Sequence, residues 1–173
     1  MSKTQQRPRS HPVLEGVEKG DTIRFTADGE TEIGTVDEAV ATKFEDTGFG
    51  YTTLPISIGR TIVDIGAEFK PGSGWTQLEA TERVYSGKSG TEWQVIGPIE
   101  ELVVLNPGID ADAVRLGDTL EHLDGTHYRV VELPYERQYD DKFLCYSRET
   151  ASNACKKIDS SEVVEHIGRG DEL

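Results

Sequence analysis

The sequence predicts a mainly β fold, built from hairpins that form one or two small β-barrels, with one or two short helices. Three stretches show the hairpin pattern, in which runs rich in β-forming residues flank a turn that contains glycine. Leucine, isoleucine, valine and phenylalanine are spread along the chain and form no single long block. At 173 residues the chain can bury one core of ordinary size or two small ones.

The most informative stretch is 117–133, which turns at Asp124-Gly125. An Asp-Gly pair tolerates the positive φ that a tight hairpin turn requires. One face of this hairpin must be buried. The side chains expected to be buried are Leu120 and Leu123 on the first strand and Tyr128, Val130, and Leu133 or Val131 on the second.

A related order of residues occurs near the start of the chain. Gly-Asp-Thr-Ile at 20–23 and Asp-Gly at 28–29 match Gly-Asp-Thr-Leu at 117–120 and Asp-Gly at 124–125, with Ile33 and Val36 taking the places of Tyr128 and Val131. The copies are too few for a solenoid. A third hairpin is predicted over 81–95, with its turn at 86–90, Val84 and Tyr85 on one arm, and Trp93 and Val95 on the other.

The segments between the hairpins are less distinctive. Val36, Val40 and Phe44 stand at helical spacing, so 37–44 is interpreted as two turns of helix, with a strand as the alternative. Strand character returns over 52–65, where Pro55 suits an edge strand or a bulge. The further elements expected are strands over 99–105 and 143–146, a short helical turn over 109–114, and a closing strand or short helix over 158–167.

The predicted domain organisation has three parts. Residues 1–15 form a basic N-terminal arm, 16–168 a β-barrel domain, and 169–173 a C-terminal tail. The loop Lys70-Pro71-Gly72-Ser73-Gly74 is the best candidate for an internal boundary, so the barrel region could also divide into 16–66 and 75–168.

Charge is the strongest compositional signal, because the formal net charge is −14. This acidity is typical of halophilic proteins, whose charge repulsion is screened by concentrated salt, and it could also give a surface that repels nucleic acid. No apolar run approaches the length of a membrane span, and the N-terminus lacks the apolar core of a secretory signal. A soluble protein that is not exported by that route is expected, with no membrane partner.

No set of residues with a recognisable reaction chemistry is present, so no catalytic residue, cofactor or metal ligand is predicted. Gly87-Lys88-Ser89 lacks the glycine spacing and helix of a phosphate loop. His122 and His127 could approach across their turn as a surface metal site, but a polar turn explains them equally well. Cys145 and Cys155 could pair across a hairpin, although two small buried thiols in a reducing cytoplasm are favoured.

Partner contacts are predicted at three places. Residues 1–12 of the arm carry positive charge without any acid, and the loop after residue 133 carries two tyrosines. A basic cluster near the C-terminus could contact phosphate or an acidic neighbour, with a solvated surface as the alternative. The predicted partner-binding residues are Lys3, Arg7, Arg9, Tyr135, Tyr139, Arg148, Lys156 and Lys157.

One part of the chain resembles a known family. The order Leu116-Gly117-Asp118-Thr119-Leu120, Asp124-Gly125, Tyr128-Arg129-Val130-Val131, preceded by Asn106-Pro107-Gly108, is similar to the closing hairpin of head-closure, or head-to-tail joining, proteins of tailed viruses. The resemblance implies a small SH3-like barrel and a non-enzymatic neck subunit that forms a ring of identical copies. Such a subunit lies between the portal or adaptor and the tail, around a channel through which DNA passes without sequence-specific binding.

Together with the acidity, this resemblance implies a virion protein of a tailed virus that infects a halophilic archaeon, assembled in the host cytoplasm. The alternative is a small-barrel nucleic-acid-binding module of a halophilic archaeon. That alternative needs a basic face that also bears aromatic side chains, and Arg148, Lys156, Lys157 and the arm are the residues that offer one. An enzyme of the small β-barrel type is a third class, which no motif supports.

Overall fold

The computed structural model describes residues 10–87, 90–134, 142–149 and 155–168, and it confirms a mainly β fold of small barrel-like units. The chain divides into unit 1, Met1–Val104, and unit 2, Leu105–Leu173, each with its own hydrophobic core. The boundary is not at 67–74, because that segment joins β5 to β6 inside one sheet of unit 1. In the described part of the chain, no helix has the length and apolar character that a membrane span needs.

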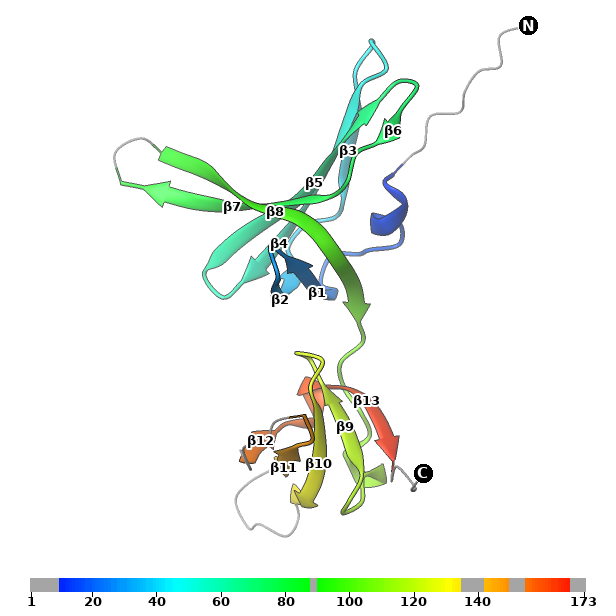
Figure 1. The fold of residues 1–173 in the computed structure, drawn as a ribbon, viewed down its shortest axis with the longest axis vertical. Helices are drawn as coiled ribbons and strands as arrows, with labels where there is room; N and C mark the ends of the chain where they lie inside the picture. The colour runs from blue at the N-terminus through cyan, green and yellow to red at the C-terminus, as the bar shows by residue number, and fades with distance from the viewer. Residues whose placement is uncertain (1–9, 88–89, 135–141, 150–154, 169–173) are drawn as a thin grey trace, which may run out of the picture. The chain divides into compact units, whose positions relative to one another are not determined.

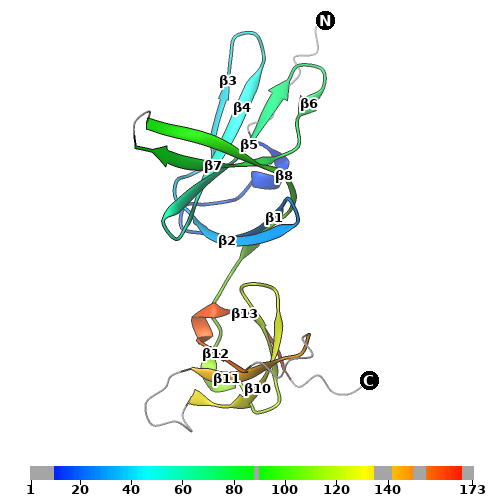
Figure 2. The same cartoon turned by 60° about the vertical axis from the view of Figure 1, so that its left-hand side comes forward.

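Unit 1 is an eight-stranded sheet in the order β3-β4-β2-β1-β8-β7-β5-β6. A further pairing between β4 and β5 joins the sheet back on itself, which closes six of the strands into a barrel (Figures 1 and 2). The strands are β1 (Thr22–Ala27), β2 (Glu30–Val36), β3 (Ala41–Phe44), β4 (Gly50–Ile58), β5 (Thr61–Lys70), β6 (Gly74–Trp75), β7 (Glu79–Ser86) and β8 (Gly90–Leu105).

Alternation along these strands fills the barrel with apolar side chains. In β1 every second residue is buried, and Ile23 and Phe25 lie in the centre of the core with Leu54, Ile56 and Ile65. Leu14, the last residue of the short 3₁₀ turn Pro12–Leu14, is also fully buried in this core. The predicted arm 1–15 therefore extends too far, since residues 11–14 belong to the barrel.

Unit 2 is a five-stranded antiparallel sheet in the order β12-β11-β10-β9-β13. The first four strands follow one another as a meander, and the last crosses to the other edge after a 3₁₀ turn at Ser160–Glu162. The strands are β9 (Thr119–His122), β10 (His127–Glu132), β11 (Phe143–Ser147), β12 (Cys155–Ile158) and β13 (Val163–Gly168). Phe143, Leu120, Val130, Ile158 and Val163 fill the core.

The repeated sequence pattern forms the same structure in both units. Asp21 accepts a hydrogen bond from the Glu18 amide through its carboxylate, and Asp118 accepts one from the Arg115 amide, both at 2.8 Å. The backbone groups of Gly20 and Asp21 bond to Val36, and those of Gly117 and Asp118 bond to Val130. We call this arrangement the Gly-Asp corner. Val36 thus corresponds to Val130, not to Val131 as the sequence comparison suggested.

The two Asp-Gly turns take different forms. Asp28 and Gly29 both have positive φ, 52° and 74°, and they form a two-residue connection between the paired residues Ala27 and Glu30. At Asp124-Gly125 only the glycine has positive φ, 84°, and the longer turn closes with a hydrogen bond from the His122 amide to the Thr126 carbonyl. Val131 is exposed and Leu133 buried, which settles the alternative that the sequence left open.

Two expectations are corrected by strand pairing. Residues 41–44 form strand β3, not a helix, because they pair with β4 from Ala41↔Thr53 to Phe44↔Gly50. Residues 99–105 are not a separate strand but the second part of β8, which spans sixteen residues and lies between β7 and β1. The short helical turn expected within 109–114 is confirmed as the 3₁₀ turn Ala111–Ala113.

Candidate interaction surface

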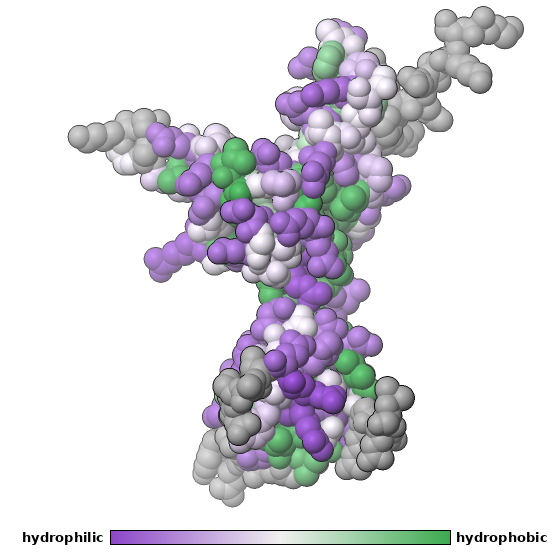
Figure 3. Space-filling model, viewed as in Figure 1, coloured by the Kyte–Doolittle hydropathy of each residue, from purple (hydrophilic) through white to green (hydrophobic). Residues whose placement is uncertain are grey.

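The hairpin formed by β7 and β8 extends from the rest of unit 1 as an arm (Figures 1 and 2). Arg83 pairs with Trp93 and Tyr85 with Thr91, so these side chains project from one side of the arm. On that side Tyr85 is 72% exposed, Trp93 56% and Val95 61%. Figure 3 shows hydrophobic atoms at the surface of this arm among hydrophilic ones. We call the side bearing Arg83, Tyr85, Trp93 and Val95 the aromatic face.

Arg83 fixes the base of the aromatic face. Its guanidinium donates two hydrogen bonds of 2.8 Å to the carboxylate of Asp64 on β5, and it lies 5.1 Å from the centre of the Trp93 ring. Asp64 is only 6% exposed. The hydrogen bonds to Asp64 are the main reason that the pKa of Arg83 is raised, and they favour its charged form. The Trp93 ring is therefore held against a cation whose position is set by the barrel.

An acidic groove continues from the aromatic face across β5 and β7. It has a volume of about 710 Å³ and is bounded by Trp93 at one side, with Asp64, Glu68 and Glu79 among its lining residues. Of the described residues that line it, none is lysine or arginine. Because Arg83 neutralises Asp64, the free negative charge of the groove comes from the exposed carboxylates of Glu68 and Glu79.

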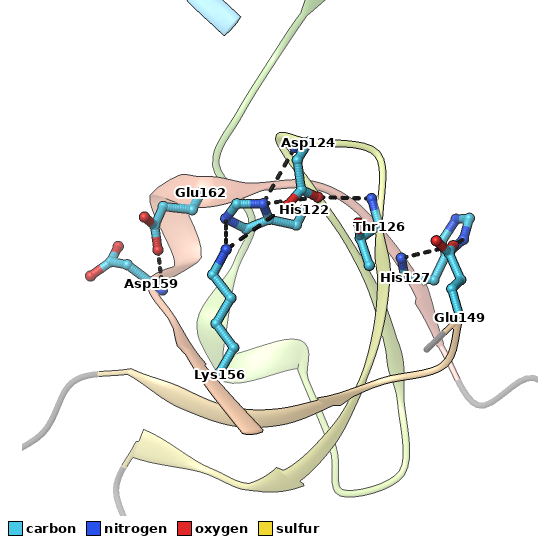
Figure 4. A network of polar contacts seen from close by, with 8 residues as sticks. All are labelled: His122, Asp124, Thr126, His127, Glu149, Lys156, Asp159 and Glu162. Atoms are coloured by element: carbon cyan, nitrogen blue, oxygen red, sulfur yellow. Dashed lines mark hydrogen bonds and ion pairs between the residues drawn. The ribbon is translucent and has the colours of Figure 1, made fainter. Parts of the chain in front are cut away.

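Unit 2 separates the three predicted basic residues. Lys156 is in a polar network at the tip of the β9–β10 hairpin, where its ammonium lies 3.4 Å from Nε2 of His122 and 3.9 Å from the carboxylate of Asp124 (Figure 4). It also lies 5.6 Å from the centre of the Tyr128 ring. These contacts connect the turn to β12 and set Lys156 apart from Arg148 and Lys157, and its predicted partner contact stays a prediction.

The other two predicted residues lie on a different face, together with residues that the sequence did not single out. Tyr146 on β11 stands opposite Arg129 on β10, and Lys157 on β12 stands opposite Leu144. The guanidinium of Arg148 donates a hydrogen bond of 2.9 Å to Thr119, which is itself opposite Arg129. We call the outward side bearing Arg129, Tyr146, Arg148 and Lys157 the basic face. Glu121 and Glu132 border it in the sheet.

The signal that could have found Arg129 was the alternation of β10. Tyr128 and Val130 were expected to be buried, and the residue between them must then point outward. Register decides its neighbour Tyr146, and no short turn between β10 (ending at Glu132) and β11 (beginning at Phe143) marks that register in the sequence.

The histidines contact separate partners. His122 and His127 do not approach each other as ligands, because His127 bonds to Glu149 at 2.9 Å while His122 bonds to Asp124 and Lys156 (Figure 4). His166 bonds to Asp118 of the Gly-Asp corner at 2.7 Å. Among the described residues no group of three or more histidine, cysteine, aspartate or glutamate side chains is placed to hold a metal ion.

The two cysteines have different environments. Cys145 is fully buried on β11, and burial raises the pKa of its thiol to about 12. Cys155 on β12 is exposed and pairs with Tyr146, so the two sulfur atoms project to opposite sides of the sheet and remain free thiols. The expectation of two buried cysteines is correct for Cys145 and wrong for Cys155.

Five of the predicted partner-binding residues lie outside the described residues. They are Lys3, Arg7 and Arg9 in the N-terminal segment and Tyr135 and Tyr139 in the loop after β10. The predicted contacts of these five side chains stay predictions.

Comparisons with known proteins add no family. No protein-family model matches the chain, and neither the curated proteins nor the solved structures contain a significant match. The fold and the surface define the class of this protein, which is a mainly β protein of two small barrel-like units with an exposed aromatic face.

Proposed function

We propose that this protein is a non-enzymatic structural subunit that assembles with copies of itself, as a head-tail connector of a tailed virus infecting a halophilic archaeon. The observation that carries the proposal is the aromatic face. Tyrosine, tryptophan and arginine are the residues most enriched at the centres of protein interfaces, and large apolar side chains exposed together on one face mark interaction sites.

The side chains of the aromatic face are held in fixed positions, and this supports a role of the face in binding a partner. The two hydrogen bonds between Arg83 and Asp64 hold the base of the β7–β8 hairpin in place, and the Trp93 ring lies against the Arg83 guanidinium. A surface that is already ordered loses little conformational entropy when it binds, which favours association. The neck position itself is supported by the sequence resemblance of 116–131 and by the small barrel-like sheet in which that stretch lies.

Acidity fits the same role. In concentrated salt the repulsion between copies with a net charge of −14 is screened, while short-range apolar contacts persist. In a ring around a channel, an acidic wall repels passing DNA and favours sliding over adhesion. The ring, its neighbours on the portal and tail sides, and the DNA channel are all parts of the proposal.

The test is the assembly state of the full chain in concentrated potassium chloride, by sedimentation velocity and negative-stain electron microscopy. We expect rings or ring fragments from the wild type, and Trp93→Ala together with Tyr85→Ser should reduce assembly strongly. Val84→Ala, on the opposite side of the same arm, is the matched control and should assemble normally. A wild type that stays monomeric at every salt concentration contradicts the proposal.

The N-terminal segment provides a separate test. Its charges, Lys3, Arg7 and Arg9, have no acidic neighbour within the segment, so we propose that it contacts an acidic copy. Deletion of 1–9 should weaken assembly at an unchanged melting temperature. The deletion must stop before His11, because His11 and Leu14 are buried in unit 1 and their loss would destabilise the barrel itself.

A second candidate function is favoured by the basic face. A nucleic-acid-binding barrel needs basic side chains around an exposed aromatic ring, and Arg129, Arg148 and Lys157 surround Tyr146 in this way. Fluorescence anisotropy with labelled single-stranded and duplex DNA tests it. Binding that weakens steeply with salt and is lost in Arg129→Glu would favour this function.

A further inference from the structure

We propose that the basic face of unit 2 in one copy docks against the aromatic face and acidic groove of unit 1 in a second copy. This inference rests on the proposed self-assembly and names the two surfaces that make the contact. It is carried by their complementarity. One surface offers free carboxylates beside a tryptophan, and the other offers two arginines and a lysine around a tyrosine.

The charges on the two surfaces are opposite and exposed. Glu68 and Glu79 lie in the groove and are exposed, and no positive side chain is among the groove's described lining residues. Arg129, Arg148 and Lys157 are exposed on the basic face. Arginine binds carboxylates through two parallel hydrogen bonds, so Arg129 is suited to the carboxylate of Glu79.

The apolar parts also match. Tyr85, Trp93 and Val95 are exposed on the first surface, and Tyr146 and Val131 are each 39% exposed on or beside the second. An interface usually has an apolar centre with a polar rim, and each surface has that composition. The groove beside Trp93 has a volume of about 710 Å³, which gives an aromatic side chain room to enter.

A protein partner is favoured over DNA by the acids that border the basic face. Glu121 and Glu132 stand beside Arg129 and Tyr146 in the sheet, and the chain as a whole has a net charge of −14. DNA is a long polyanion, so these carboxylates and the negative charge of the rest of the chain would both repel it. A small acidic groove can contact the arginines without approaching those other charges.

The two surfaces differ, so a copy can bind one neighbour through its basic face and another through its aromatic face and acidic groove. A contact of this heterologous kind repeats from copy to copy, and it gives a ring when the rotation closes. Self-docking through these two surfaces is therefore one way to form the ring that the proposed function requires.

Charge reversal in the full chain tests the pairing. Glu79→Arg alone and Arg129→Glu alone should each weaken self-association by about 10-fold or more, because each variant places like charges in contact. Mixing the two single variants should restore association, since alternating copies then form one native and one reversed contact. The double variant should also self-associate. Sedimentation velocity in potassium chloride measures each case.

Matched controls reverse exposed charges away from both surfaces. Arg60→Glu, in the turn between β4 and β5, and Glu45→Arg, after β3, should leave association unchanged. Circular dichroism and melting temperature verify that each variant folds. If one reversal unfolds the chain, the neutral pair Glu79→Gln and Arg129→Gln replaces it, with weakening expected in both.

The outcomes separate this inference from the proposed function. Wild-type assembly that both charge reversals leave intact overturns the inference and leaves the assembly proposal standing. A wild type that never assembles overturns both. Arg129→Glu that abolishes binding to a labelled DNA oligonucleotide while self-association persists overturns the inference in favour of nucleic-acid binding.

Discussion

His11 shows how one buried side chain fixes the start of the described chain. Its Nδ1 accepts a hydrogen bond from the Val13 amide at 3.2 Å, and its Nε2 lies 3.3 Å from the Thr76 carbonyl, to which it donates. Both bonds need the neutral ring with its proton on Nε2. Burial lowers the pKa of His11 below its ordinary value of 6.5, against the opposing effect of the Thr76 carbonyl.

This lowered pKa predicts a loss of stability in acid. As pH falls below 6.5 the unfolded chain binds a proton at residue 11 before the folded chain does, so the free energy of unfolding decreases until the folded pKa is reached. Above 6.5 the contribution is complete. Thermal unfolding of the wild type and of His11→Gln at pH 7.5 and pH 5.5 measures this loss. Between these two pH values, the variant should lose less stability than the wild type.

The Arg83–Asp64 pair gives a second prediction at this scale. Arg83→Ala leaves the carboxylate of Asp64 buried without its bidentate partner, so we expect a loss of about 1–3 kcal/mol in the free energy of unfolding. Urea unfolding measures the loss. Arg60→Ala removes an exposed arginine and should change stability by less than about 0.5 kcal/mol. Equal effects of the two substitutions would contradict a stabilising role for the pair.

Among the secondary-structure elements, the contact between β2 and β4 depends on a missing side chain. A Cβ atom at Gly34 would overlap the side chain of Ile56 and lie 2.7 Å from the carbonyl oxygen of Ser57. We expect Gly34→Ala to destabilise unit 1 by about 1–3 kcal/mol, because backbone cannot move aside as a flexible side chain can. Gly87→Ala, where nothing lies within 4 Å, is the control for chemical denaturation. A Gly34→Ala protein as stable as that control would show that β4 shifts freely.

The elements also show which parts of the fold the sequence could predict. Hairpins marked by Asp-Gly were predictable, since turn chemistry and alternation are local properties. The strand at 41–44 was not, because its apolar spacing fits a helix and only pairing with β4 decides the matter. The closure of unit 1 through β4 and β5, and the arrangement of Trp93 on Arg83, depend on non-local register in the same way.

At the scale of the whole molecule, two separate cores predict two unfolding events. Leu120→Ala in unit 2 and Ile65→Ala in unit 1 each remove a fully buried side chain and should cost about 2–5 kcal/mol in their own unit. Differential scanning calorimetry in concentrated salt should show one transition moved by each substitution and the other unchanged. If either substitution moves both transitions together, the units unfold as one cooperative body.

The Gly-Asp corner occurs in both units with the same hydrogen bonds, and this has a consequence for biosynthesis. Unit 1 occupies a continuous stretch of chain ending at Val104, so during synthesis the residues of its corner leave the ribosome well before residues 114–119 do. During translation, therefore, the strand of Val36 is available to the first corner before the similar strand of Val130 appears. Refolding from denaturant presents both at once, and exchanged partners are the characteristic error of chains with similar neighbouring units.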